Sequence, residues 1–127
     1  LRVSARGGGP RLAGRVWGDA TVAYAWAYGV ALDAVAAWEV SPRGAWLRAL
    51  LLDRERVANH RGALGALGND AALGFGLAQF SRLREDWQRL NHELFGHRFM
   101  MDRVAPGSGA VDFSVDAGCQ RLVTYCW

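Results

Sequence analysis

A long run of apolar residues at helical spacing constrains the fold of this chain more than any other feature. Between Leu73 and Met101, large apolar side chains, with one histidine among them, recur every three or four positions. That spacing places them on one face of an α-helix, and such a face is normally buried against a neighbour. The stripe comprises Leu73, Leu77, Phe80, Leu83, Trp87, Leu90, Leu94, His97 and Met101. It predicts a long amphipathic helix, which Pro106-Gly107-Ser108-Gly109 terminates.

Two further helices are predicted upstream of this stripe. The first spans about Thr21 to Trp38, with Asp19 as its N-cap. The second begins at Ser41-Pro42, where a serine N-cap precedes a proline at the first helical position. It continues to about Leu67, where glycines weaken its end. The predicted apolar faces are Tyr24, Tyr28, Ala31, Val35 and Trp38 in the first helix, and Trp46, Leu50, Val57 and Leu64 in the second.

The remaining segments define the expected organisation of a single domain. Residues 1–18 are rich in arginine and glycine and predict a flexible segment, and residues 19–106 form the helical core. In the tail, residues 107–127, alternation over 110–116 and 121–127 indicates short strands. The sequence therefore predicts a mainly α fold: a bundle of about three long antiparallel helices with a short irregular or β-like C-terminal piece.

The charge pattern argues against nucleic acid as a partner. The chain has 127 residues and a net charge of +3, and its arginines are scattered. In the most basic region, acidic residues such as Glu85 and Asp86 alternate with Arg84 and Arg89. Alternating signs are typical of a solvated helix face, whereas a nucleic-acid site normally shows a basic stripe.

The histidines and cysteines do not form a recognisable metal site. His92 and His97 come close to the H-E-x-x-H motif, but their spacing of five places them about 140° apart around a helix. His97 lies on the apolar stripe and is expected to be a hydrogen-bonded core histidine. Cys119 and Cys126 are not spaced as C-x-x-C and cannot alone supply four ligands. We therefore predict no metal bound by this chain.

The segment Asn59-His60-Arg61-Gly62 is the densest polar constellation inside a predicted helix. With Glu55 and Asp70 on either side, it is a candidate proton relay or polar-ligand site. The alternative is a polar patch that faces a neighbouring helix, in which Glu55 pairs with an arginine. No Ser-His-Asp arrangement, phosphate loop or G-x-G-x-x-G motif is present, so spacing alone gives no reaction.

Several polar motifs fall in an order that resembles a known family. They are Gly18-Asp19-Ala20-Thr21, Val40-Ser41-Pro42-Arg43, Glu55-Arg56-Val57-Ala58-Asn59-His60, Gly65-Ala66-Leu67-Gly68-Asn69-Asp70, Leu83-Arg84-Glu85, Leu90-Asn91, Gly96-His97-Arg98 and Met101-Asp102-Arg103. Over about residues 13–113, the chain resembles the central part of group 4 membrane-associated nickel–iron hydrogenase large subunits, including those of formate hydrogenlyase. The related quinone-site subunit of respiratory complex I (NADH dehydrogenase) belongs to the same family.

One departure from the family is decisive for chemistry. The family's R-I-C-G-I-C element supplies two thiolates to a nickel–iron (Ni–Fe) centre. Here the run is Arg15-Val16-Trp17-Gly18-Asp19-Ala20, so Trp17 and Ala20 stand at the cysteine positions. Neither an indole nor a methyl group can replace a thiolate at a soft metal site. The family's second cysteine pair is also missing, so we expect the Ni–Fe ligands to be lost.

The resemblance implies a partial or degenerate large subunit of a hydrogenase or NADH–quinone oxidoreductase type of redox complex. It implies a quinone, an iron–sulfur small subunit that carries a 4Fe–4S cluster, and membrane-arm subunits as indirect partners. The chain would be cytoplasmic and peripheral at the inner face of the membrane, and inactive alone. Glu55, His60, Arg61 and Asp70 would be pocket or proton-path residues. The alternative is a non-catalytic helical scaffold, adaptor or relic, for which exposed tryptophans would form a partner-binding surface.

Overall fold

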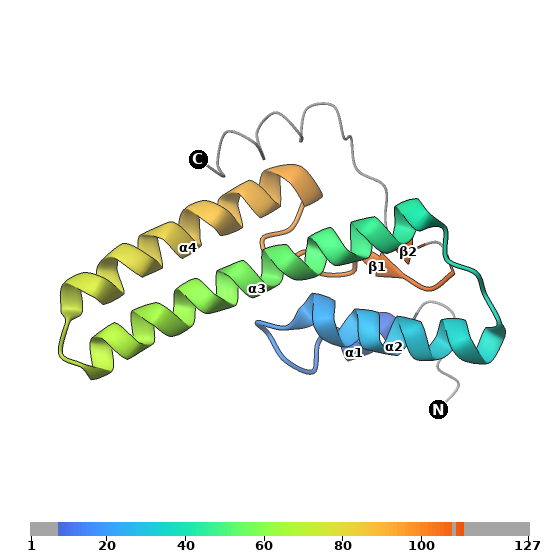
Figure 1. The fold of residues 1–127 in the computed structure, drawn as a ribbon, viewed down its shortest axis with the longest axis horizontal. Coiled ribbons are helices and arrows are strands. Elements are labelled where there is room, and N and C mark those ends of the chain that lie inside the picture. The colour runs from blue at the N-terminus through green and yellow to red at the C-terminus, as the bar shows by residue number, and fades with distance from the viewer. Residues whose placement is uncertain (1–7, 108, 111–127) are drawn as a thin grey trace.

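Two long antiparallel helices organise the fold (Figure 1). A computed structural model describes residues 8–107 and 109–110 of the chain. The helices are α1 (Gly8–Ala13), α2 (Thr21–Ala36), α3 (Pro42–Asp70) and α4 (Gly74–Phe95). Strands β1 (Val104–Ala105) and β2 (Gly109–Ala110) form one short antiparallel pair. The mainly α prediction with three long helices is confirmed. Within the described ranges, no helix combines the length and apolarity needed to cross a bilayer.

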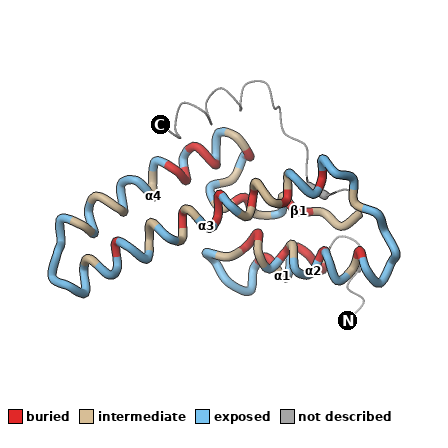
Figure 2. Tube along the Cα trace, viewed as in Figure 1, coloured by how far each residue is buried: buried red, intermediate tan, exposed pale blue. Residues whose placement is uncertain are grey.

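The helical hairpin of α3 and α4 is longer than the rest of the fold. Helix α2 packs along the N-terminal part of α3 and also contacts α1 and β1. The far half of the hairpin extends beyond these elements, and Figure 2 shows that most of its surface is exposed. The structure therefore has a packed end around α2 and a projecting end at the α3–α4 turn.

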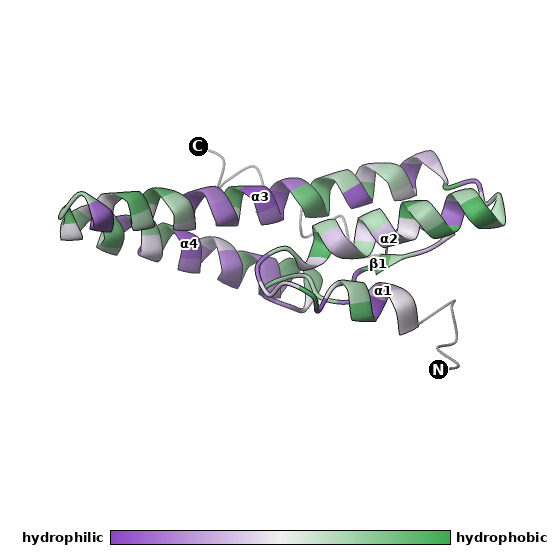
Figure 3. Cartoon of the chain, turned by 90° about the horizontal axis from the view of Figure 1, so that it is seen from below, coloured by the Kyte–Doolittle hydropathy of each residue, from purple (hydrophilic) through white to green (hydrophobic). Residues whose placement is uncertain are grey.

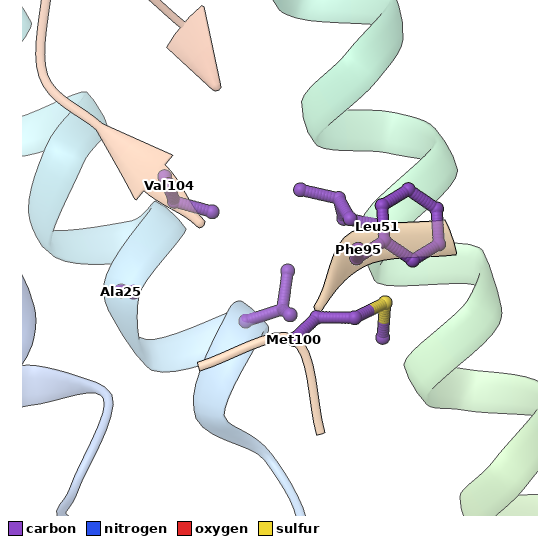
Figure 4. Close-up of a cluster of buried hydrophobic side chains, with 6 residues drawn as sticks. Ala25, Leu51, Phe95, Met100 and Val104 are labelled. Carbon is purple, nitrogen blue, oxygen red and sulfur yellow. The ribbon is translucent and has the colours of Figure 1, made fainter. Parts of the chain in front are cut away.

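The hydrophobic core lies where α2, α3 and the chain after α4 meet (Figure 4). Ala25 comes from α2, Leu51 from α3 and Phe95 from the last turn of α4. Met100 and Val104, which follow α4, close the cluster from the other side. Burial of the larger side chains in this cluster stabilises the fold by about 1.5–3 kcal/mol each, so this junction holds the described elements together.

The start of α3 follows the sequence prediction, whereas the start of α2 does not. Ser41 is the N-cap of α3, and its hydroxyl accepts a hydrogen bond from the Gly44 amide at 3.1 Å. The N-cap of α2 is Ala20, without a side-chain cap. The prediction of Asp19 was wrong because a glutamate of α3 satisfies the first amides of α2 instead.

Helix α4 ends earlier than the apolar stripe predicts. Its C-cap is Gly96 in the left-handed conformation, with φ of 73°. At that φ a side chain is strained, and a Cβ would also lie 2.7 Å from the Arg103 guanidinium. His97 and Met101 therefore lie in turns after the helix, although their spacing continues the helical period. A local glycine cap overrides periodicity here.

The buried faces of α2 and α3 differ from the predicted faces. In α2 the predicted aromatic stripe is exposed, and the buried residues are Thr21, Val22, Ala25, Gly29 and Asp33. In α3, Trp46 is 77% exposed, while the buried set includes the charged residues Arg48, Arg54 and Glu55. These predictions were wrong because small residues in α2 let the two helices approach closely, and because buried charged groups of α3 pair with groups of α2, as Arg48 does with Asp33.

The N-terminal segment also departs from its prediction where the structure describes it. Residues 8–13 form helix α1, in which Gly9 and Pro10 are buried. The absence of a Cβ at Gly9 leaves space for the Tyr28 ring of α2. Tertiary contact thus outweighs the weak helix propensity of Gly-Gly-Pro. Most of the predicted β-like tail, with both cysteines, lies outside the described residues.

Candidate functional site

Charged and polar side chains fix the loop between α1 and α2, residues 14–20, against the hairpin. Arg15 donates to both carboxylate oxygens of Asp102, at 3.2 and 2.9 Å. Arg84 of α4 forms an ion pair with Asp19 at 3.1 Å. Asn59 of α3 donates from its side-chain amide to the Asp19 carbonyl at 2.8 Å. Three segments distant in sequence therefore hold this loop in place.

An open pocket of about 370 Å³ lies between this loop, α3 and α4. Small residues of α3 leave space for it, and a Cβ added at Gly62 would lie 3.3 Å from the Arg84 guanidinium. The Trp17 indole, which is largely exposed, lines the pocket near the loop. The lining residues are Trp17, Asp19, Asn59, Gly62, Ala63, Ala66 and Arg84. They offer aromatic stacking, an ion pair and a carboxamide, and no nucleophile paired with a base.

Glu55 lies next to this pocket and caps α2. One carboxylate oxygen accepts from the Val22 amide at 2.6 Å and the other from the Ala23 amide at 3.0 Å. These amides belong to the first turn of α2, which has no intrahelical acceptor for them. Burial raises the pKa of Glu55, while the two amide hydrogen bonds lower it and the Asp19 charge raises it further. The geometry therefore gives Glu55 a structural role at this helix end.

A small cavity of about 10 Å³ adjoins Glu55. That volume is about the minimum for one water molecule. Six of its nine lining residues carry amide or charged side chains, and two of these, Asp19 and Asn59, also line the larger pocket. The cavity residues are Asp19, Glu55, Ala58, Asn59, Gln88, Asn91, Arg98, Phe99 and Met100.

The other three candidate site residues lie apart from Glu55. His60 is exposed on α3. The Arg61 guanidinium stacks 4.6 Å from the centre of the Trp87 ring and donates to the Leu83 carbonyl at 2.9 Å. Asp70 is the exposed last residue of α3, and its fifteen-residue separation from Glu55 corresponds to about 22 Å along the helix. The structure does not bring the four residues together at one point.

Two buried cationic clusters were missed by the sequence analysis. Arg48 forms an ion pair with Asp33 at 2.8 Å, with both side chains buried. Arg54 donates to Asn91 at 2.5 Å and stacks 4.0 Å from the centre of the Trp87 ring. The signal that could have found the first cluster is a register in α3 that places Arg48 on the same face as Leu51 and Glu55.

An exposed charged cluster joins α4 to the turns after it. Glu85 accepts from Arg89 at 2.9 Å and from Arg98 at 2.5 Å. The Arg89 hydrogen bond, followed by that from Arg98, lowers the pKa of Glu85. Because this cluster faces solvent, it contributes to local order more than to stability.

The 14–20 loop does not offer the ligands of a Ni–Fe centre. Trp17 and Ala20 provide no donor atom that could replace thiolates. Within residues 8–107 and 109–110, no three His, Cys, Asp or Glu side chains are grouped to hold a metal ion. His97 lies beyond α4, where its Nδ1 accepts from the Phe99 and Met101 amides at 3.2 and 3.4 Å. His92 and His97 therefore do not share a helix.

The chain matches no protein-family profile, no curated protein and no solved structure.

Proposed function

We propose that this chain is a large-subunit-like helical component of a hydrogenase or complex I type of redox complex. In this proposal it has lost the Ni–Fe ligands and contributes a partner-binding framework. Electron transfer belongs to the 4Fe–4S cluster of an iron–sulfur small subunit and to a quinone at the junction. The chain by itself carries no redox step.

One observation carries the proposal: residues from separate family-like motifs converge on the loop at the family's metal position. Asn59 belongs to the Glu55–His60 motif, Arg84 to Leu83-Arg84-Glu85 and Asp102 to Met101-Asp102-Arg103. All three contact residues 15–19 of the loop. A chance similarity of short motifs would not require them to meet at this position. The convergence supports a scaffold retained after its thiolates were replaced.

The exposed aromatic surface favours the alternative of a non-catalytic scaffold or adaptor. Trp17 is 62% exposed, and Trp46 is exposed at the other end of α3. Tyr24 and Tyr28 are exposed along α2. Large apolar side chains of this kind are enriched in protein–protein contacts. In this alternative, the same surfaces bind partners without any redox change.

The experiment that separates the two functions uses the chain purified from its source cells through an affinity tag. Dithionite-reduced preparations are mixed with a soluble quinone, and reoxidation of the cluster is followed by its visible absorbance. A complex I type of role predicts quinone-dependent reoxidation. Partner binding without reoxidation would overturn the redox role and leave the scaffold.

A charge-swap series tests the loop itself. Asp19→Arg breaks the ion pair with Arg84, and the proposal predicts slower reoxidation and weaker retention of the small subunit. Adding Arg84→Asp restores an ion pair of opposite polarity and should recover part of the loss. Glu39→Arg, at an exposed position between α2 and α3, is the matched control. If all three variants show the same reoxidation rate and the same retention of the small subunit, the loop has no role in either.

A further inference from the structure

The projecting half of the α3–α4 hairpin exposes leucines on the side opposite the 14–20 loop. Leu67 is 64% exposed and Leu73 is 57% exposed, and Leu64 and Leu83 are also exposed. Figure 3 shows that the end of the hairpin is mainly hydrophobic, with the hydrophilic surface concentrated nearer its middle. With two glycines between the leucines, residues 64, 67, 68, 73, 76 and 83 are here called the hairpin face. A group of exposed leucines on a projecting element indicates a contact surface.

The contacts and the helical period place these leucines on one side of the hairpin. Gly65 marks the side of α3 that faces α4, since a Cβ there would lie 3.3 Å from an α4 side chain. At about 100° per residue, Leu64 and Ala66 lie on opposite sides of that line. Ala66 lines the pocket beside the loop, so Leu64 lies on the other side. On α4, Gln88 lines the cavity on the loop side, and Leu83 lies about 140° around the helix from it.

The two glycines of the hairpin face bring the helices close together. A Cβ at Gly68 would lie 3.7 Å from the backbone carbonyl carbon of Gly76, and a Cβ at Gly76 would lie 3.4 Å from the Leu73 side chain. Between the leucines the face therefore presents a strip without side chains. Large side chains beside such a strip suit packing against an identical surface, because leucines of one copy can pack on the glycines of the other.

The charge distribution also permits contact between identical faces. A charge near a two-fold axis would lie close to its own copy. Asp70 is the single charged residue from Gly62 to Ser81, and it lies four residues after Ala66, on the loop side. Over residues 53–61 and 82–86, with Asp19 included, five arginines are balanced by five carboxylates. Two hairpins that approach through this face therefore do not repel each other.

The exposed area is sufficient for a dimer of modest affinity. The exposed fractions of the four leucines correspond to about 350 Å² of apolar surface, which is the size of a typical contact patch on a soluble protein. With the smaller residues between the leucines, two such faces would bury about 1,200 Å² in total, the lower end of the range for specific complexes. The expected dimer is therefore one that forms in the micromolar range.

We propose that the hairpin face binds the same face of a second copy, giving a two-fold symmetric dimer with four helices at the contact. An anionic bilayer would gain no attraction from the balanced charges behind the face. A charged partner protein would need complementary charges, which the face does not carry. This inference is independent of the redox function proposed above.

The test is sedimentation velocity of the full chain from low to high micromolar concentration. A reductant is present, so that disulfides of Cys119 or Cys126 cannot produce dimers. The proposal predicts a monomer–dimer equilibrium. Leu64→Ser on α3 and Leu83→Ser on α4 should each weaken dimerisation about tenfold or more, because two-fold symmetry removes each side chain twice.

Matched controls lie on the other helices. Leu12→Ser on α1 and Val35→Ser on α2 also remove exposed apolar side chains, and both variants should dimerise as the unmodified chain does. Circular dichroism checks that all variants fold. A chain that stays monomeric at every concentration would overturn the proposal, as would equal losses in face and control variants.

Two further outcomes would assign the hairpin face to another occupant and so overturn the proposal. Monomers that bind phosphatidylcholine vesicles, with loss of binding in Leu64→Ser, would assign it to lipid. Dimers that form only after residues 111–127 are removed would assign it to that segment of the same chain.

Discussion

Removing the Glu55 carboxylate should destabilise the fold through the end of α2. Glu55→Ala leaves the Val22 and Ala23 amides without their acceptors, which now lie at 2.6 and 3.0 Å. A buried donor left unsatisfied costs about 1–3 kcal/mol, and because the Val22 amide is buried while the Ala23 amide is only partly buried, the combined loss is about 2–4 kcal/mol. Since domains of this size are stable by about 5–15 kcal/mol, the effect is large.

Urea unfolding followed by circular dichroism measures the loss as a change in the free energy of unfolding. Glu55→Gln is the informative intermediate, because an amide retains one acceptor oxygen and should lose about half as much. Glu39→Ala, an exposed glutamate, should change stability by less than about 0.5 kcal/mol.

The pH dependence of the same comparison follows from the sign of the pKa shift. Burial raises the folded-state pKa of Glu55 above 4.5, so the folded chain holds this proton more tightly than the unfolded chain. The stability difference between the unmodified chain and Glu55→Gln should therefore fall as pH rises from about 4.5 through the raised pKa. Above that pKa the difference should be constant.

Two results would refute the capping account. The first is a stability of Glu55→Ala equal to that of Glu39→Ala, because the amides of α2 would then have other acceptors. The second is unchanged stability with loss of redox turnover in the purified complex, which would assign Glu55 to proton transfer. The structure predicts instead that Glu55→Ala lowers the stability of the fold, and that any loss of turnover is a consequence of that lower stability.

Three further predictions concern the ion pairs and the pocket. Asp33→Ala should lower the free energy of unfolding by about 3–5 kcal/mol in urea titrations, because it leaves Arg48 buried without its carboxylate. Gly62→Val should displace the Arg84 guanidinium, so that trypsin cleaves the α1–α2 loop faster while helix content is unchanged. Because the pKa of Glu85 is lowered, its contribution to stability is present above about pH 4.5 and is lost as pH falls through the folded pKa. Glu85→Gln should remove this dependence in thermal melts between pH 5 and 2.

Local signals in the sequence predicted the helices better than their orientation. Ser41-Pro42 marks the start of α3 because a hydroxyl cap and a proline act within one turn. The positions of large apolar residues did not predict the buried faces. In α2 the buried face is formed by Val22, Ala25 and Gly29, whereas the tyrosines are exposed. Which face is buried depends on how closely another helix approaches, and spacing does not contain that information.

The candidate site was harder to predict for the same reason. Glu55 was identified as a special residue, but its partners Val22 and Ala23 lie more than thirty positions away. His60 and Asp70 were selected for proximity in sequence, and the helix places them on different surfaces or at its far end. The contacts of Asn59 and Arg84 with the loop depend on how α3 and α4 pack against each other, which the sequence pattern does not specify.

The composition of the complex purified from source cells tests the central claim most directly. The measurement is the iron and acid-labile sulfide content per tagged chain, together with the identity of the co-purified subunit. Our account predicts a stoichiometric iron–sulfur small subunit and about four iron atoms per chain, as expected for one 4Fe–4S cluster. A chain that purifies without iron and without that subunit would contradict the account.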